Sequence, residues 1–184
     1  MLKIGIILGS TRPGRNGKAV AEWVLEHANK HGDAQYELVD VQEYNLPLLD
    51  EAMPAAYGQY EKAHTKKWAE KIAELDGFVF VAAEYNHAMA GALKNAIDFI
   101  YGEWNNKAAG IVSYGSAGGA RAAENLRLVL GELQVADVRQ QVLLSLMTDF
   151  ENYSVFKPHP RHEEELAVLL TQVNAWAGAL KAIR

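Results

Sequence analysis

Apolar and amphipathic stretches alternate along this chain from the first residues to the last. Five short runs are rich in β-branched and aliphatic residues, as buried strands are, and each precedes a stretch whose apolar residues recur at helical spacing. Strict strand–helix alternation predicts an α/β fold of three layers, with a five-stranded parallel sheet and helices on both faces. The expected strands are residues 2–8, 36–41, 78–83, 108–114 and 137–145, and the expected helices are residues 17–30, 64–75, 93–100, 126–133 and 166–180.

The strands differ in how apolar they are, which indicates their places in the sheet. Residues 2–8 are almost continuously apolar, as in a central strand, whereas residues 36–41 alternate and suit an edge. The connection over residues 42–58 contains Pro47 and Pro54, which exclude regular structure there. Its leucines predict that it folds over apolar surface, and a loop of this kind often borders a site.

The loop after the first strand combines bending, hydroxyl and cationic residues. It begins at Gly9, contains Arg12 and Arg15, and runs into the helix expected from Gly17. Such a loop presents backbone N–H groups and the positive end of the helix dipole to an anion. The arginines favour phosphate, because a guanidinium group matches phosphate oxygens better than an ammonium group does. The sequence therefore predicts a site for a phosphate ester.

Two common phosphate-binding motifs do not account for this loop. A Walker A loop ends in Gly-Lys-Ser/Thr after a glycine five residues earlier, but here Gly17-Lys18 is followed by Ala19, and Arg12 stands at the earlier position. The dinucleotide fingerprint GxGxxG fails because Thr11 replaces its second glycine. Taken alone, the loop leaves open a plain turn that joins a strand to a helix.

Two further loops follow strands at the same predicted edge of the sheet. Glu84, Tyr85, Asn86 and His87 come after the third strand and form a dense polar group, while residues 115–119 come after the fourth and are mostly glycine. Glycines let backbone amides approach a flat ligand closely. Because loops at the carboxyl ends of parallel strands converge, we expect one pocket for a mononucleotide with a planar ring. This outline does not identify the ring, and an adenine or guanine nucleotide would fit it equally well.

Composition narrows the classes of function further. The chain is long enough for one domain, taken here as residues 1–184, and its net charge of −5 argues against a nucleic-acid partner. The absence of cysteine excludes disulfides, thiolate metal sites and cysteine nucleophiles, and the six histidines form no closed ligand set, so we expect no metal site. We see no secretion signal and no apolar run long enough to span a bilayer, and expect a cytoplasmic protein without membrane contact.

Three motifs together resemble a known family. The segments GSTRPGRNG, EYNHAMAGALKNAIDF and SYGSAGGARA, at their separations here, are similar to those of the NAD(P)H-dependent FMN reductases, which have the flavodoxin-like fold. The resemblance covers residues 2–145 and includes the segment LPLLD at residues 46–50. The chain departs from the family pattern at Ala83 and Ala90, where the family often has proline, and neither change removes a ligand group.

The resemblance implies FMN as cofactor and assigns a role to each loop. The first loop would hold the FMN phosphate, the second would lie against the isoalloxazine ring, and the third would contact the polar edge of the ring. The implied cofactor-binding residues are Ser10, Arg12, Arg15, Asn16, Gly17, Glu84, Tyr85, Asn86, His87, Gly115, Ser116 and Gly118.

The resemblance also implies a reaction: NAD(P)H as co-substrate passes a hydride to FMN, which then reduces a small-molecule electron acceptor such as a quinone, a free flavin or an azo compound. A flavin carries this chemistry itself, so we assign no catalytic side chain. We expect backbone N–H groups of Gly118 and Gly119 to stabilise charge on the reduced ring. A proton-transfer role for His87 stays open beside the simpler one of packing at the pocket lip.

Two other classes of function remain open at this point. The first is a flavodoxin-type electron carrier, although carriers usually have a hydroxyl-rich phosphate loop without arginines. The second is a flavin-free regulatory or scaffold domain. Family members generally pair through helices beside the flavin, so we expect a homodimer and leave further pairing to a homotetramer open. Phe99, Tyr101 and Trp104 offer apolar surface for that pairing, although the same aromatic residues would also suit the core.

Overall fold

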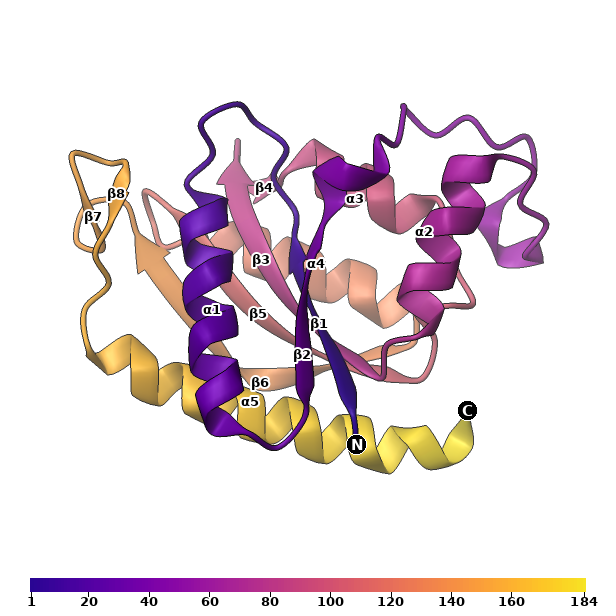
Figure 1. The fold of residues 1–184 in the computed structure, drawn as a ribbon. Helices are drawn as coiled ribbons and strands as arrows, with labels where there is room; N and C mark the ends of the chain where they lie inside the picture. Colours follow the sequence, from indigo (N-terminus) through magenta and orange to yellow (C-terminus); the bar gives the residue numbers. More distant parts are fainter.

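The computed structural model describes all 184 residues and confirms the parallel sheet (Figure 1). Five parallel strands lie in the order β2-β1-β3-β5-β6, so the strand order reverses beside β1 and the carboxyl ends of the strands share one edge. The first strand is central and the second is at an edge, as predicted. The strands are β1 (Lys3–Leu8), β2 (Gln35–Asp40), β3 (Gly77–Tyr85), β5 (Lys107–Gly115) and β6 (Val135–Ser145).

Five helices cover the two faces of the sheet (Figure 1). One apolar cluster joins α1 and α5 to one face, and a second joins α2, α3 and α4 to the other face. The three-layer arrangement is therefore the predicted flavodoxin-like sandwich. The helices are α1 (Gly17–His31), α2 (Ala63–Ala73), α3 (Gly91–Asp98), α4 (Ala120–Glu132) and α5 (Arg161–Leu180), and a short 3₁₀ turn, η3 (Lys181–Ile183), follows α5.

Large aromatic residues fill the face covered by α2, α3 and α4. Trp68 and Trp104 are fully buried, and each indole N–H donates to a backbone carbonyl oxygen, of Ala96 at 2.8 Å and of Ile97 at 3.2 Å. A buried indole N–H without an acceptor would destabilise the fold, because it gives up its hydrogen bond to water and gains none within the protein. Both tryptophans therefore fix the position of α3 against the sheet.

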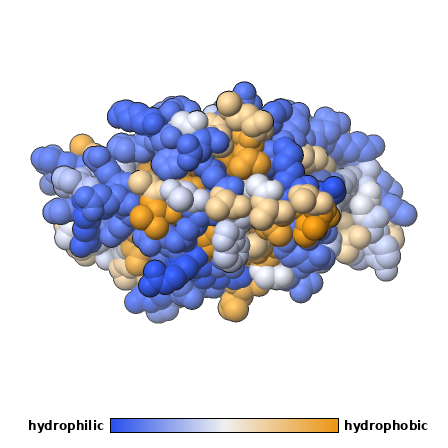
Figure 2. Space-filling view, turned by 90° about the horizontal axis from the view of Figure 1, so that it is seen from below, coloured by the Kyte–Doolittle hydropathy of each residue, from blue (hydrophilic) through white to orange (hydrophobic).

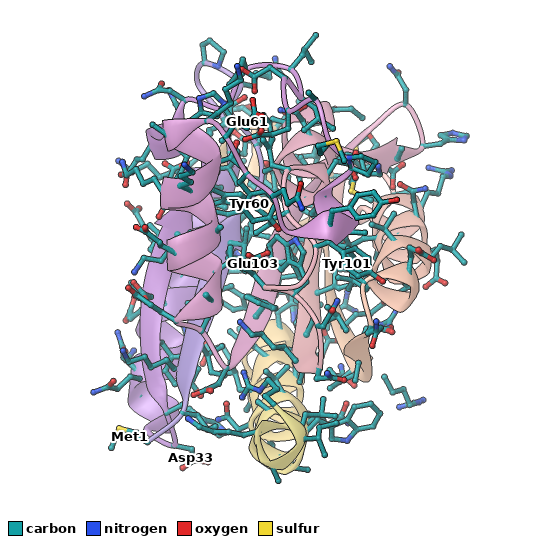
Figure 3. All side chains as sticks on the ribbon, turned by 90° about the vertical axis from the view of Figure 1, so that its right-hand side faces the viewer. Met1, Asp33, Tyr60, Glu61, Tyr101 and Glu103 are labelled. Carbon is teal, nitrogen blue, oxygen red and sulfur yellow. The ribbon has the colours of Figure 1, made fainter.

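The expected partner surface is wrong for two of its three aromatic residues. Phe99 and Trp104, which follow the end of α3, are fully buried in the core, and the Trp104 ring packs against Trp68 and Phe78. Tyr101 is half-buried, and its hydroxyl donates to the carbonyl oxygen of Glu132 at the end of α4. Figure 3 shows this side of the molecule, where the Tyr60 hydroxyl also donates to Glu103 at 2.8 Å.

Two short hairpins extend the predicted pattern. Strand β3 continues to Tyr85 and pairs antiparallel with β4 (Ala88–Met89), so the expected polar loop is a hairpin with a two-residue turn. A second hairpin joins β7 (Phe150–Glu151) to β8 (Val155–Phe156). Both turns place two consecutive residues at positive φ, as tight hairpin turns require, and these residues are Asn86, His87, Asn152 and Tyr153.

The connection after β2 is only partly as expected. It contains the two short 3₁₀ turns η1 (Val41–Tyr44) and η2 (Ala55–Tyr57), each of three or four residues. Leu46 packs against the core cluster, but Leu48 and Leu49 are exposed to solvent. The expectation that the leucines fold down over apolar surface is therefore wrong for Leu48 and Leu49, which leave apolar side chains on the molecular surface.

Helix α5, with the 3₁₀ turn that follows it, has the length and composition of a membrane span over Arg161–Ile183, which differs from our expectation that no such run exists. A core helix of a globular domain meets the same criterion. Figure 2 views the α5 side of the molecule, where apolar patches are separated by hydrophilic surface. The apolar composition of α5 follows from the residues that this helix buries against the sheet: Leu166, Leu169, Leu170, Val173 and Ala177.

Candidate functional site

A cavity of about 330 Å³ opens at the carboxyl edge of the sheet, where the sequence predicts a ligand. It lies between the loop after β1, the ends of β3 and β5, and the β7–β8 hairpin. The residues that line it are Arg12, Gly14, Arg15, Asn16, Glu84, Tyr85, Tyr114, Gly115, Leu146, Tyr153 and Ser154.

The loop after β1 supplies the cationic end of the cavity. Arg12 is exposed and has no ion-pair partner, so its guanidinium group is free to meet an anion. Helix α1 begins at Gly17, and the first N–H groups of a helix have no partner within the helix. A Cβ atom at Gly17 would lie 2.6 Å from the Tyr114 hydroxyl, so only glycine fits there without displacing a neighbour. These groups could hold an anion at this end of the cavity, and phosphate binding there stays a prediction.

Arg15 lines the same cavity, but its charge is already compensated. Its guanidinium group donates to both carboxylate oxygens of Asp40, one of them at 2.8 Å, and to the carbonyl oxygen of Ser10. Both side chains of this pair are largely buried. The expectation of two free arginines is thus wrong for Arg15, which ties the phosphate loop to the end of β2. Its contact with a phosphate group stays a prediction.

A hydrogen bond joins the first loop to the second. The Ser10 and Tyr85 hydroxyl oxygens are 2.9 Å apart, although these residues are 75 positions apart in the chain. Ser10 is fully buried, while Tyr85 is more than one-third exposed and borders the cavity. The two predicted loops therefore converge, and Tyr85 is placed beside the phosphate loop.

Glu84 connects the second loop to the third. Its carboxylate accepts from the backbone N–H of Arg121 at 3.1 Å and from the Arg121 guanidinium group at 2.8 Å, at the start of α4. Burial alone would raise the pKa of Glu84, but these hydrogen bonds together lower it below its usual value. Glu84 is therefore ionised at neutral pH, and it holds the glycine-rich loop in place.

The glycine-rich loop turns sharply before α4. Gly118 and Gly119 have φ values of 69° and 72°, which side chains other than glycine rarely adopt. The Gly118 N–H donates to the carbonyl oxygen of Gly115 at 3.0 Å, so the expectation that it faces the ring edge is wrong. The Gly119 N–H is left as the candidate for that contact.

Six predicted residues lie outside the cavity lining: Ser10, Gly17 and Gly118, described above, and Asn86, His87 and Ser116. Asn86 and His87 form the exposed turn of the β3–β4 hairpin, with φ values of 50° and 69°. Ser116 is exposed and its carbonyl oxygen accepts from the Ser145 hydroxyl. Ring contacts by these residues stay predictions, as does a proton-transfer role for His87.

Besides Gly14, which belongs to the predicted phosphate loop but was not assigned a contact, four cavity residues escaped the sequence analysis: Tyr114, Leu146, Tyr153 and Ser154. Tyr114 is the inward-facing residue at the end of a predicted strand, and only its position next to the glycine-rich loop could have drawn attention to it. The other three belong to the segment after β6, where no periodic pattern or motif is visible. Nothing in the sequence indicates that this segment folds back to the phosphate loop.

The residues present fit a flavin nucleotide. The cationic end offers Arg12 and the start of α1 to a phosphate group, and the buried Tyr114 hydroxyl next to it has no hydrogen-bond partner within the protein. Burial raises the pKa of Tyr114 to about 12, so its hydroxyl keeps its proton at neutral pH. A buried hydroxyl without a partner costs roughly 1–3 kcal/mol, which a polar ligand in this cavity could recover.

Comparisons with known proteins agree with this geometry. The family described as NADPH-dependent FMN reductase matches residues 2–149. An NAD(P)H-dependent FMN reductase from a Nectria species is 38% identical over 191 residues, which cover 98% of this chain and 90% of that protein. A quinone reductase from Escherichia coli K12 is 31% identical over 138 residues, with 70% of this chain and 69% of that protein covered.

A solved structure shows the same fold at low sequence identity. A flavoenzyme NAD(P)H:(acceptor) oxidoreductase from Paracoccus denitrificans superposes with a TM-score of 0.74 and 18% identity. The superposition covers 97% of this chain and 98% of that one. The architecture is therefore common to this chain and to a flavoenzyme along nearly the whole of both chains.

Proposed function

The chain belongs to the NADPH-dependent FMN reductase family, and we propose that its carboxyl-edge cavity binds the FMN through which it reduces quinones, free flavins or azo compounds at the expense of NAD(P)H. The observation that carries this assignment is the hydrogen bond between Ser10 and Tyr85, which brings the phosphate loop and the ring-side loop together beside the free Arg12 guanidinium group. The carrier alternative has no support among the relatives, which are named as reductases.

When bound, FMN supplies the hydride chemistry, and the protein supplies position and electrostatics. Arg12 and the N–H groups at the start of α1 bind the phosphate group. Tyr85, whose hydroxyl oxygen is 2.9 Å from that of Ser10, lines the cavity and would lie against the ring system. Glu84 holds the start of α4 and thereby orients the Gly119 N–H. Gly115 gives the floor of the cavity a surface without a side chain, open to a flat ring.

The phosphate assignment is tested by Arg12→Ala. Loss of one charge-assisted contact of about 1.5–3 kcal/mol should raise the dissociation constant of FMN roughly 10- to 100-fold. Riboflavin, which lacks the phosphate group, should bind Arg12→Ala and the unaltered protein alike. Isothermal titration of the apoprotein with each flavin gives both dissociation constants.

Lys18→Ala is the matched control for Arg12→Ala, because Lys18 is an exposed cation in the first turn of α1 that faces Glu22 and does not line the cavity. Lys18→Ala should leave FMN affinity within about twofold of the unaltered value, since a solvent-exposed charge that does not contact the ligand contributes little to binding. Equal FMN affinity for Arg12→Ala and the unaltered protein would remove Arg12 from the site.

We further propose that the protein is a homodimer that pairs through the face formed by α3, α4 and η2. A groove of about 470 Å³ runs between these elements, and Tyr101, Leu128 and Ala55 are among its lining residues. Leu128 is 78% exposed at its rim, and exposed apolar surface of this kind usually marks an interface. Dimers of this family pair beside the flavin, and a second copy of the chain is therefore the occupant that we assign.

Leu128→Glu tests the dimer. A carboxylate there would meet its own symmetry mate or apolar surface, so the dimer dissociation constant should rise at least about tenfold. Sedimentation equilibrium measures this, with Ile183→Glu as control, because Ile183 is exposed near the C-terminus and outside the groove. A monomeric unaltered protein would overturn the proposal. A single domain over residues 1–184, a cytoplasmic location and a further tetramer stay predictions.

A further inference from the structure

The β7–β8 hairpin is a wall of the cofactor cavity that the family match does not include. The match ends at residue 149, and the hairpin occupies Phe150 to Phe156. Tyr153 and Ser154, at its turn, line the cavity together with Arg12 and Asn16 of the phosphate loop. These two residues come from a segment in which the sequence shows no motif, yet they lie at the end of the cavity that carries the positive charge.

A direct hydrogen bond ties the hairpin to the phosphate loop. The Asn16 side-chain amide donates to the carbonyl oxygen of Tyr153 at 2.7 Å, across 137 positions of sequence. Asn16 is the residue before the first turn of α1, so the bond reaches the start of the helix. The hairpin is therefore held against the element that presents its N–H groups to the cavity.

The backbone of the turn is strained in a way that needs a reason. Tyr153 has a φ value of 59°, a conformation that is uncommon for a bulky residue, where glycine is the usual choice in the second position of such a turn. A residue in this region costs of order 1 kcal/mol or more relative to an ordinary conformation. The turn holds this conformation beside the cavity, which Tyr153 lines.

A buried cluster fixes the base of the hairpin. Asp149 is 1% exposed and accepts from the Ser145 N–H at 2.9 Å and the His159 N–H at 3.0 Å. His162, equally buried, has one ring nitrogen 3.1 Å from Asp149 and the other 2.7 Å from Glu165. Asp149 thus accepts hydrogen bonds from Ser145, before the hairpin, and from His159, after it. These bonds hold the two ends of the hairpin together.

Aromatic packing supports the hairpin from below. The Phe150 and Phe156 rings are 5.1 Å apart between centroids, and Phe150 also meets Tyr114 at 6.3 Å. Phe156 meets Trp23 of α1 at 5.8 Å. The hairpin is therefore packed on α1 and on the end of β5, where Tyr114 lines the cavity.

We propose that Tyr153 and Ser154 are further FMN-binding residues, which contact the phosphate end of the cofactor and slow its dissociation. The proposal rests on the assignment of FMN to this cavity. The hairpin lies beside Arg12 and Asn16 of the phosphate loop, so we assign its contact to the phosphate end of FMN rather than to the ring. A phenol and a primary hydroxyl group are both donors suited to phosphate oxygens.

The test compares the dissociation of FMN with that of riboflavin from single variants. Tyr153→Gly removes the side chain and gives the turn the sequence Asn-Gly, which favours positive φ at both positions, so the hairpin should stay folded. Ser154→Ala removes only the hydroxyl group. We expect the FMN dissociation rate constant to rise about fivefold or more in Tyr153→Gly and about threefold in Ser154→Ala, while that of riboflavin changes less than twofold.

Met147→Ala is the matched control, since Met147 is 61% exposed, as Tyr153 is, and precedes the hairpin without lining the cavity. It should leave both rate constants unchanged. Unchanged FMN dissociation in both hairpin variants would overturn the proposal, and so would equal acceleration for FMN and riboflavin. If the unaltered protein took up no FMN at all, the assignment of FMN to the cavity would fail. That result is distinguishable from failure of the hairpin proposal, in which the unaltered protein binds FMN and the variants release it at the same rate.

Discussion

Gly119→Ala should lower the free energy of unfolding by about 2–4 kcal/mol. Gly119 has a φ of 72°, and an added Cβ atom would lie 2.7 Å from the backbone nitrogen of Tyr114 and 2.7 Å from the Cβ atom of Ser113. The backbone conformation costs an L-residue roughly 1–2 kcal/mol, and overpacking a close-packed site typically costs 1–3 kcal/mol. Both contacts are with β5, a buried strand paired on both sides, so its backbone cannot move aside without breaking sheet hydrogen bonds. Urea unfolding followed by circular dichroism measures the loss.

Gly14→Ala separates the two causes. Gly14 has a similar φ of 67°, but no atom lies within 4 Å of the position that its Cβ would take. This substitution should therefore cost only the backbone contribution of roughly 1–2 kcal/mol. An equal loss in both variants would show that crowding at Gly119 contributes nothing, and that the tight approach of the glycine-rich loop to β5 is not what shapes this wall of the cavity.

Asp149→Ala should cost about 3–5 kcal/mol of unfolding free energy. The substitution removes the acceptor of several buried hydrogen bonds and leaves the ring of His162 facing one carboxylate instead of two. Deleting the acceptor of several buried hydrogen bonds typically costs this much in total, because each donor left without a partner stays desolvated. Asp33→Ala is the control, since Asp33 faces His31 at 3.4 Å on the exposed surface, and it should cost less than about 1 kcal/mol.

The same carboxylate predicts how stability depends on pH. Burial alone would raise the pKa of Asp149, but hydrogen bonds from His159, Thr148 and Ser145, together with the charge of His162, lower it below its ordinary value of 3.8. The folded state therefore favours the ionised form, and its stabilising contribution is present above pH 3.8 and is lost as the pH falls through the lowered pKa. Unfolding free energy measured between pH 5 and pH 2 should fall more steeply for the unaltered protein than for Asp149→Ala. Parallel curves would contradict this.

The layered fold was predictable because its determinants are local. The apolar runs at β1, β3 and β5 and the helical spacing between them fix the element order, and the order fixes a parallel sheet with a shared carboxyl edge. The convergence of the phosphate loop, the Glu84–Tyr85 segment and the glycine-rich loop follows from this topology alone. The family match over residues 2–149 agrees with the ligand site predicted from these three loops.

The two hairpins were not predictable from residue type. Both turns use Asn followed by His or Tyr at positive φ, instead of the Asn-Gly pair by which such turns are usually identified. The polar residues after β3 therefore predict an irregular loop. In the β7–β8 hairpin the strands contribute only two residues each, too few for a periodic pattern.

Long-range pairing explains the errors within the site. The sequence predicts Arg15 as a phosphate ligand, because its ion-pair partner Asp40 is 25 positions away in the chain. Only the fold brings the two side chains together. Phe99 and Trp104 suit surface or core equally in the sequence, because they lie in the connection after α3, where no helical or strand period indicates which residues are buried. In each case a contact distant in sequence determines the role of the residue.

Anaerobic titration of the FMN-loaded protein with NADPH tests the central claim most directly. One flavin per chain, held by its phosphate group beside Arg12 and by its ring beside Tyr85 and Gly115, should lose its visible absorbance promptly on addition of one equivalent of NADPH, and a quinone added afterwards should restore it. A protein that stays yellow with excess NADPH, or that retains no FMN after desalting, would contradict the account.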